Sequence, residues 1–269
     1  MTIENLYPFA GAHAVQNATF AIEWPDLLPE SVIVEASKLG TKFKNVGLDH
    51  HLLQHQVELK LANSPNAQHS QKSIIGGILF STSQEVTPTA RSVLISRNAC
   101  IVSIPDYTRW AAALGDVEKY LKIVLDEIGP LRPISVIGLQ YTDVFSWKDD
   151  PAELNLEEVF SPDYFVPKNV LRQKNLWHLH QGYFEKHSTP VSHVLLENIN
   201  LDTHDNNGLR LIQITGSHRA TLETLMWQSH MKNKGNLFSM FAALHQANKN
   251  MLSKLLMPEV RNRINLDAK

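Results

Sequence analysis

Residues 107–147 read YTRWAAALGDVEKYLKIVLDEIGPLRPISVIGLQYTDVFSW, and this stretch decides the fold class. In its first part, apolar residues recur at alternating intervals of three and four from Tyr107 to Ile128, which predicts an amphipathic helix. Gly129 and Pro130 end that helix. Residues 133–147 carry little charge and predict one long strand. A long helix next to a long strand is typical of a protein in which helices cover a sheet.

Shorter strand patterns surround this stretch. Residues 55–62 alternate cleanly between apolar and polar, as a strand with one buried face does. Arg97-Asn98 and Asn207-Gly208 stand between apolar runs and predict tight reversals, because Asn and Gly tolerate positive φ. A second long helix is predicted from the N-cap Asn236 to the residue before Pro258.

The order of these elements predicts an α+β fold with two lobes. Each lobe is expected to be a mostly antiparallel sheet covered by one long helix, in residues 1–148 and 170–269. An acidic connection that contains prolines, residues 149–169, would join them. The similar order of elements in the two lobes makes a diverged duplication a hypothesis.

Composition excludes several classes of protein. The 25 Lys and Arg against 27 Asp and Glu give a net charge of −2, so a protein that grips a nucleic-acid backbone is not expected. The single cysteine, Cys100, lies in an apolar run and cannot form an internal disulfide, which favours a reducing compartment. No apolar run approaches the roughly 20 residues that span a bilayer. We therefore expect a cytoplasmic protein without membrane contact.

The densest group of chemically active side chains is NLWHLHQGYFEKH, residues 175–187. On a strand, His178 and His180 project from one face, and Trp177 projects from the other. Two histidines on one strand suit a metal ion, but no spacing fixes a third ligand. The sequence thus predicts no metal and no cofactor, and His178 and His180 line a groove or meet solvent. A metal-dependent hydrolase or nuclease that uses both histidines is the alternative.

A second candidate is ITGSHRAT, residues 214–221. Gly216, Ser217 and Arg219 would bind an anion there if the segment forms a turn, through backbone N–H groups and the guanidinium. This interpretation predicts a small-molecule or nucleotide ligand. No Gly-x-Ser-x-Gly elbow and no phosphate-binding glycine motif occurs in the chain.

Several short motifs in order resemble a sporadically distributed family of bacterial proteins of unknown function. Members of that family carry a serine–arginine turn, a tyrosine and tryptophan on the next helix, and a Gly-Leu-x-Tyr strand. The matching residues here are Ser96, Arg97, Tyr107, Trp110, Gly138, Leu139 and Tyr141. The match covers most of residues 15–266. This chain departs from the family at Ile137 and at Thr142-Asp143, where an arginine and an asparagine are usual.

The resemblance implies an α+β fold and a patchy distribution among bacteria, which is typical of genes in defence islands or toxin–antitoxin modules. It brings no catalytic residues. We therefore expect a non-enzymatic protein-binding or regulatory protein, such as an antitoxin, a sensor or a chaperone-like component, with a protein partner; self-association stays open. The candidate partner-binding residues are Arg97, Tyr107, Trp110, Tyr141, Trp177, His178 and His180.

Overall fold

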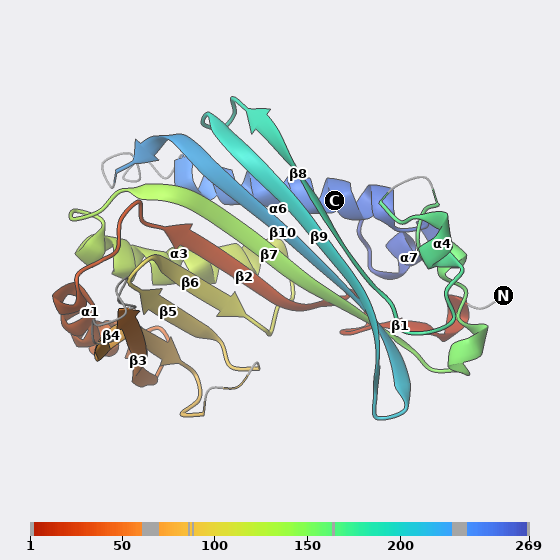
Figure 1. Cartoon of the computed structure of the whole chain (residues 1–269), viewed down its shortest axis with the longest axis horizontal. Helices are drawn as coiled ribbons and strands as arrows, with labels where there is room; N and C mark the ends of the chain where they lie inside the picture. The colour runs from red at the N-terminus through yellow and green to blue at the C-terminus, as the bar shows by residue number, and fades with distance from the viewer. Residues whose placement is uncertain are drawn as a thin grey trace, which may run out of the picture.

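The computed structural model describes residues 3–60, 70–85, 87, 89–162, 165–227 and 236–267. These residues contain one ten-stranded sheet in which neighbouring strands run antiparallel (Figure 1). The strands are β1 (Leu6–Pro8), β2 (Val15–Glu23), β3 (His50–Lys60), β4 (Ser70–Ser81), β5 (Ser92–Ser96), β6 (Ala99–Ile104), β7 (Ile134–Trp147), β8 (His178–His187), β9 (His193–Asn206) and β10 (Leu209–Met226).

Two long helices accompany several short ones in the described residues. The α-helices are α1 (Glu30–Ala36), α2 (Gly40–Lys44), α3 (Trp110–Ile128), α4 (Lys168–Leu171), α6 (Asn236–Leu255) and α7 (Pro258–Arg263). Short 3₁₀ turns are η1 (Ile3–Asn5), η2 (Ser37–Leu39), η3 (Pro151–Glu153) and η4 (Leu156–Glu158). None of the helices found in the described residues is long and apolar enough to cross a membrane.

The sheet has the order β3-β4-β5-β6-β2-β7-β10-β9-β8, with β1 beside β7. The two central strands, β2 and β7, pair with each other over most of the length of β2. The α+β class and the antiparallel sheet are thus confirmed. Two lobes with separate sheets are not confirmed, because the β2–β7 ladder joins both halves into one sheet. The expected division at residues 149–169 stays a prediction.

Helices α3 and α6 lie behind the sheet in Figure 1, so one face is covered. Their apolar stripes pack on the side chains that alternate strand residues direct to that face. Phe20 of β2 joins both helices: its ring centroid lies 5.8 Å from that of Trp110 in α3 and 5.4 Å from that of Phe241 in α6. This contact places the main core under both helices, across the β2–β7 centre.

A second core lies under the other end of the same face. There Phe145 and Trp147 of β7 pack with Phe160 and with residues of α6 and α7. Residues 149–169, predicted as a connection, supply part of its cover through η3 and η4, and α4, which extends to Leu171, adds to it.

The two predicted reversals are confirmed. Arg97 and Asn98 form the turn between β5 and β6. Asn207 and Gly208 have φ of 51° and 81° and connect β9 to β10, as the turn requires. Both long helices are present, at residues 110–128 and 236–255. The first begins three residues later than predicted, so Tyr107 lies before the helix and not on it.

Candidate functional site

One pocket formed by the described residues lies on the covered side of the sheet. It has a volume of about 770 Å³ and opens between the segment 12–15, the start of α3, β7 and α6. We call it the Asp143 pocket. Its polar and aromatic lining consists of His13, Tyr107, Thr108, Arg109, Trp110, Tyr141, Asp143, His245, Asn248, Lys249 and Asn265.

Strand and helix periodicities bring these residues together. Tyr141 and Asp143 are two apart on β7, so both project to the covered face. His245, Asn248 and Lys249 are spaced by three and four along α6, which places them on one helical face. Trp110 is the first residue of α3, where the helix meets β2.

Aromatic rings form one wall of the Asp143 pocket. The rings of Trp110 and His245 stack with centroids 4.2 Å apart and an interplanar angle of 3°. The Tyr141 hydroxyl lies 3.0 Å from Nδ1 of His245. Tyr107 meets Tyr141 edge to face at 5.7 Å. Burial, together with the charge of Lys249, lowers the pKa of His245 to about 4, so this imidazole is neutral near pH 7.

Two residues of this pocket have a buried side-chain atom without a hydrogen-bond partner among the described residues, His13 at Nδ1 and Asp143 at Oδ2, and the Asp143 carboxyl is the more unusual group. Its residue is 3% exposed, and its Oδ2 has no hydrogen-bond partner among the described residues. Burial raises the pKa of Asp143 from 3.8 to about 7. Burial also raises the pKa of Tyr107, to about 12, and the nearby Asp143 charge adds to that shift. A buried carboxylate oxygen without a partner costs free energy, so its retention points to a role in binding.

Beside the pocket, a second polar group lies between β9, β10 and α6. His218 is fully buried; its Nε2 lies 3.1 Å from Asn248 Oδ1, and its Nδ1 lies 3.5 Å from Glu197 Oε2. Burial opposes ionisation of Glu197, yet contacts from His218 and the Tyr183 hydroxyl hold the pKa of Glu197 below its ordinary value. Asn248 and Tyr183 partner His218 Nε2 and Glu197, whereas His218 Nδ1 is buried without a hydrogen-bond partner among the described residues. We assign this group to the packing of α6 on the sheet.

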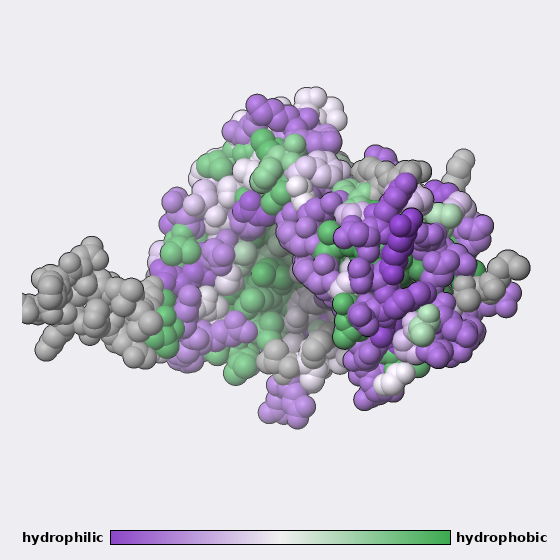
Figure 2. All heavy atoms as spheres, turned by 45° about the vertical axis from the view of Figure 1, so that its right-hand side comes forward, coloured by the Kyte–Doolittle hydropathy of each residue, from purple (hydrophilic) through white to green (hydrophobic). Residues whose placement is uncertain are grey.

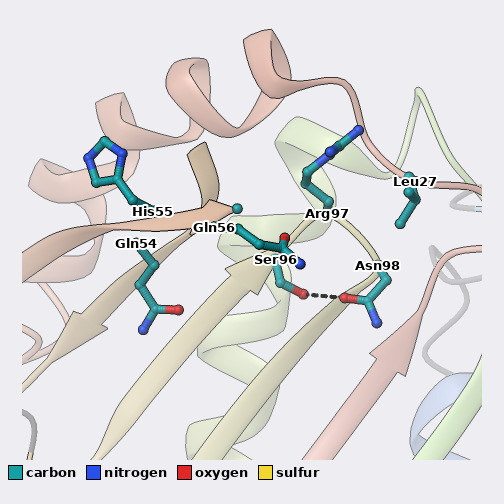
Figure 3. Close-up of a pocket in the computed structure, with 8 residues that line it drawn as sticks. Leu27, Gln54, His55, Gln56, Ser96, Arg97 and Asn98 are labelled. Carbon is teal, nitrogen blue, oxygen red and sulfur yellow. Dashed lines mark hydrogen bonds between the residues drawn. The ribbon is translucent and has the colours of Figure 1, made fainter. Parts of the chain in front are cut away.

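The second pocket, of about 460 Å³, lies at the β5–β6 turn (Figure 3). Arg97 donates through Nε to the carbonyl of Leu28, at 3.0 Å, and its backbone N–H donates to Gly76. Ser96 donates to Asn98 Oδ1 at 2.8 Å, within the same turn. Gln54, His55 and Gln56 of β3 form the opposite wall in Figure 3. Arg97 therefore ties the turn to the segment before α1, which is a structural role.

We call the other face of the sheet the open face. Two rows of side chains cross its strands. Figure 2 shows a hollow in the surface with hydrophobic residues at its bottom. The register places the residues of each row side by side on the open face. The apolar row is Leu52, Leu79, Leu94, Ile101, Ala21, Gly138, Arg219, Leu196 and Phe184. The polar row beside it is His50, Ser81, Ser92, Ser103, Thr19, Gln140, Ser217, Asn198 and Gly182.

The sequence candidates end up in different places. Tyr107, Trp110 and Tyr141 meet in the Asp143 pocket. Trp177 is half-buried and its ring packs edge to face on Phe160, at 6.1 Å, in the second core. These four residues, far apart in the chain, all lie on the covered side.

His178 and His180 lie exposed on edge strand β8, on the open face. His178 contacts Asp202 and His180 contacts Asn200, so each has its own neighbour on β9. No group of three or more metal-ligating residues occurs within the described ranges.

The segment of Gly216, Ser217 and Arg219 is not a turn. It lies in the middle of the eighteen-residue strand β10, because pairing with both β7 and β9 continues through it. Strand alternation sends Ser217 and Arg219 to the open face and Gly216 to the covered face. Arg219 forms two hydrogen bonds to Glu23, at 2.9 and 2.7 Å. A Cβ on Gly216 would lie 2.5 Å from Asn248 Oδ1, so α6 approaches closely here.

Sequence reasoning missed Asp143 and His245 as site residues. Asp143 had one signal, an acidic residue at an inward position of a long apolar strand. Inward acidic residues are rare in cores, so this position merits attention in any strand pattern. His245 had no such signal, because histidine at the apolar face of a helix is common. The chain matches no protein-family model and no curated protein sequence.

Proposed function

We propose that this chain is a non-enzymatic binding protein that holds an amphipathic segment of a protein partner on its open face. The observation that carries this proposal is the apolar row across the sheet. The side chains on a sheet face that meets only water are normally polar. Here the row ends in Phe184, 72% exposed, and Leu52, 53% exposed, although Leu79 beside Leu52 is buried. An apolar strip of this kind on an otherwise polar surface marks an interaction site.

The chemistry of the two rows defines the partner surface. The apolar row has one charged member, Arg219, and Glu23 already neutralises it. Between the His50 imidazole at one end and Gly182 at the other, the polar row offers hydroxyl and amide groups, which hydrogen-bond without charge. A partner segment with one apolar edge and one uncharged polar edge therefore fits. At about 4.8 Å per strand the nine-membered rows extend on the order of 38 Å, which matches an amphipathic helix of about 25 residues.

Co-purification tests the proposal. We expect the tagged native chain, expressed in its host, to retain a stoichiometric partner. Phe184→Asp should reduce that retention at least tenfold, because it places a charge at the end of the apolar row. Phe184 is mostly exposed, so this change should leave the free energy of unfolding within about 0.5 kcal/mol of the native value.

The matched control is Leu131→Asp. Leu131 is 51% exposed and lies in the turn after α3, outside the apolar row. It should leave partner retention unchanged. Equal loss in both variants, or no stoichiometric partner for the native chain, contradicts the proposed function.

The antitoxin, sensor or chaperone-like setting in a bacterial defence system rests on the family resemblance and stays a prediction. All three settings need a surface that holds another protein, which is the role proposed for the open face. A gene for a toxin beside this one would favour that setting, and an operon of metabolic enzymes would weaken it.

We also propose that the two halves arose by duplication. In each half the first strand lies at the centre, the later strands run from the outer edge inward, and a long helix follows. These halves, β2 to α3 and β7 to α6, divide the chain before β7 and therefore differ from the predicted lobes, residues 1–148 and 170–269. The strands follow the same order on each side of the β2–β7 pair, and this similarity supports the proposal.

A further inference from the structure

The Asp143 pocket is a site distinct from the open face. It lies under α3 and α6 on the covered side of the sheet, whereas the partner surface proposed above lies on the other side. A ligand in the pocket and a partner on the open face would therefore bind to separate surfaces. Whatever occupies the pocket can be tested by itself.

The buried end of the pocket presents an unmet hydrogen-bond acceptor. Asp143 Oδ2 lacks a partner among the described residues, although the side chain is almost fully buried. A ligand group that donates a hydrogen bond and carries positive charge would satisfy this oxygen and keep the carboxylate ionised. The charge of Asp143 is felt by both Tyr107 and Tyr141, which places these aromatic residues close to it. Aromatic walls around a carboxylate favour a cation.

The side chains at the mouth of the pocket carry positive charge, opposite to the charge of the Asp143 carboxylate. Arg109 is exposed and Lys249 is partly exposed, and both line the same pocket. Lys249 lies close enough to His245 to depress the pKa of that imidazole. A simple amine would be repelled at this mouth, whereas a molecule that also carries an acidic group would gain from it. Between the two ends, Ala14, Leu252 and Ile264 supply apolar lining.

We propose that the Asp143 pocket binds a small amphoteric molecule of the amino-acid or short-peptide class. Its basic nitrogen pairs with Asp143, its acidic group lies between Arg109 and Lys249, and its body packs along the aromatic and apolar walls. The volume of about 770 Å³ lies within the range of small-molecule sites and exceeds what a single small ion needs.

A matched ligand panel tests this inference. The probes are free amino acids and dipeptides, the same compounds as C-terminal amides, which lack the acid, and as N-acetyl derivatives, which lack the basic nitrogen. Binding to the purified chain is followed by calorimetry and by the shift in melting temperature. We expect free amino acids or dipeptides to bind, and their amides and N-acetyl derivatives to bind at least tenfold more weakly.

Substitutions at the buried end and at the mouth of the pocket test which residues bind each end of the ligand. Asp143→Asn should weaken binding about thirtyfold or more, the usual consequence of removing one partner of a buried charged pair. Lys249→Ala should weaken it about fivefold, because a pair at the mouth is partly solvated. Asp126→Asn, at an exposed position of α3, is the matched control and should change nothing. For native protein, affinity should rise as the pH passes through about 7, where Asp143 ionises.

Three results would overturn the inference. The first is that no free amino acid or dipeptide in the panel binds. The second is that Asp143→Asn leaves the affinity unchanged while the variant is folded. The third is that the amides bind as tightly as the free acids, which would show that the positive mouth contributes nothing.

Discussion

Asp143→Asn raises the free energy of unfolding of the ligand-free chain at pH 8 by about 4 kcal/mol. The pKa of Asp143 is about 7 in the folded chain and 3.8 is its ordinary value. The gap of about three pH units corresponds to about 4 kcal/mol, at roughly 1.4 kcal/mol per unit. This is the cost of holding the carboxylate ionised without a partner, and an amide of the same shape avoids it.

The sign of the pH dependence follows from the raised pKa. Below about pH 3, Asp143 is protonated in both the folded and the unfolded chain, so native protein and variant have similar stability. As the pH rises from 4 to 7, the unfolded chain ionises first, and the native protein loses stability progressively. Above about pH 7 the loss is complete.

Urea denaturation of both proteins between pH 4 and pH 8 measures this effect. The stability difference between Asp143→Asn and native protein should grow with pH and level off near pH 7 to 8. Asp126→Asn serves as the exposed control and should follow the native curve. A difference that stays constant across this range would mean that Asp143 does not titrate as a partnerless buried group.

Phe20→Ala lowers the free energy of unfolding by about 3 to 5 kcal/mol, the usual cost of emptying a buried phenylalanine site. Phe20 is fully buried on the central strand β2, between Trp110 of α3 and Phe241 of α6. Both helices lose a contact when the ring is removed, and neither can move closer without leaving its own strand contacts. The loss should thus fall at the upper part of the range.

Urea denaturation with Phe184→Ala as the comparison measures this loss. Phe184 is the same residue type on the edge strand β8, where it is 72% exposed, so its truncation should cost less than about 0.5 kcal/mol. Phe20→Leu should fall between the two. A cost for Phe20→Ala as small as that for Phe184→Ala would show that this contact does not hold α3 and α6 on the sheet.

Asp143→Asn thus separates stability from binding. The variant should fold more stably at pH 8 and yet lose the amphoteric ligand, because the same unpaired oxygen is costly when empty and attractive when occupied. Binding sites commonly retain stability costs of this kind.

Local pattern was sufficient for the two long helices and the tight turns. The helix that begins at Trp110 follows from the spacing of apolar residues, which depends only on 3.6 residues per turn. The turn at Asn207-Gly208 follows from the φ angles those two residues tolerate. The segment around Ser217 was misread as a turn because glycine and serine favour turns locally, whereas β7 and β9 on both sides hold it in a strand.

Residue periodicity alone identifies which faces of the helices and strands are apolar, and this is enough to predict the α+β class. The pairing of β2 with β7 depends on the three-dimensional packing, because strand alternation identifies a buried face but not the neighbour at each edge. The three-dimensional packing also decides the site. More than 100 residues separate Tyr107 from His245 in the chain, with Asp143 between them. These three residues meet because α3 and α6 lie on one continuous sheet. No local propensity encodes that arrangement; the packing of the whole covered face does.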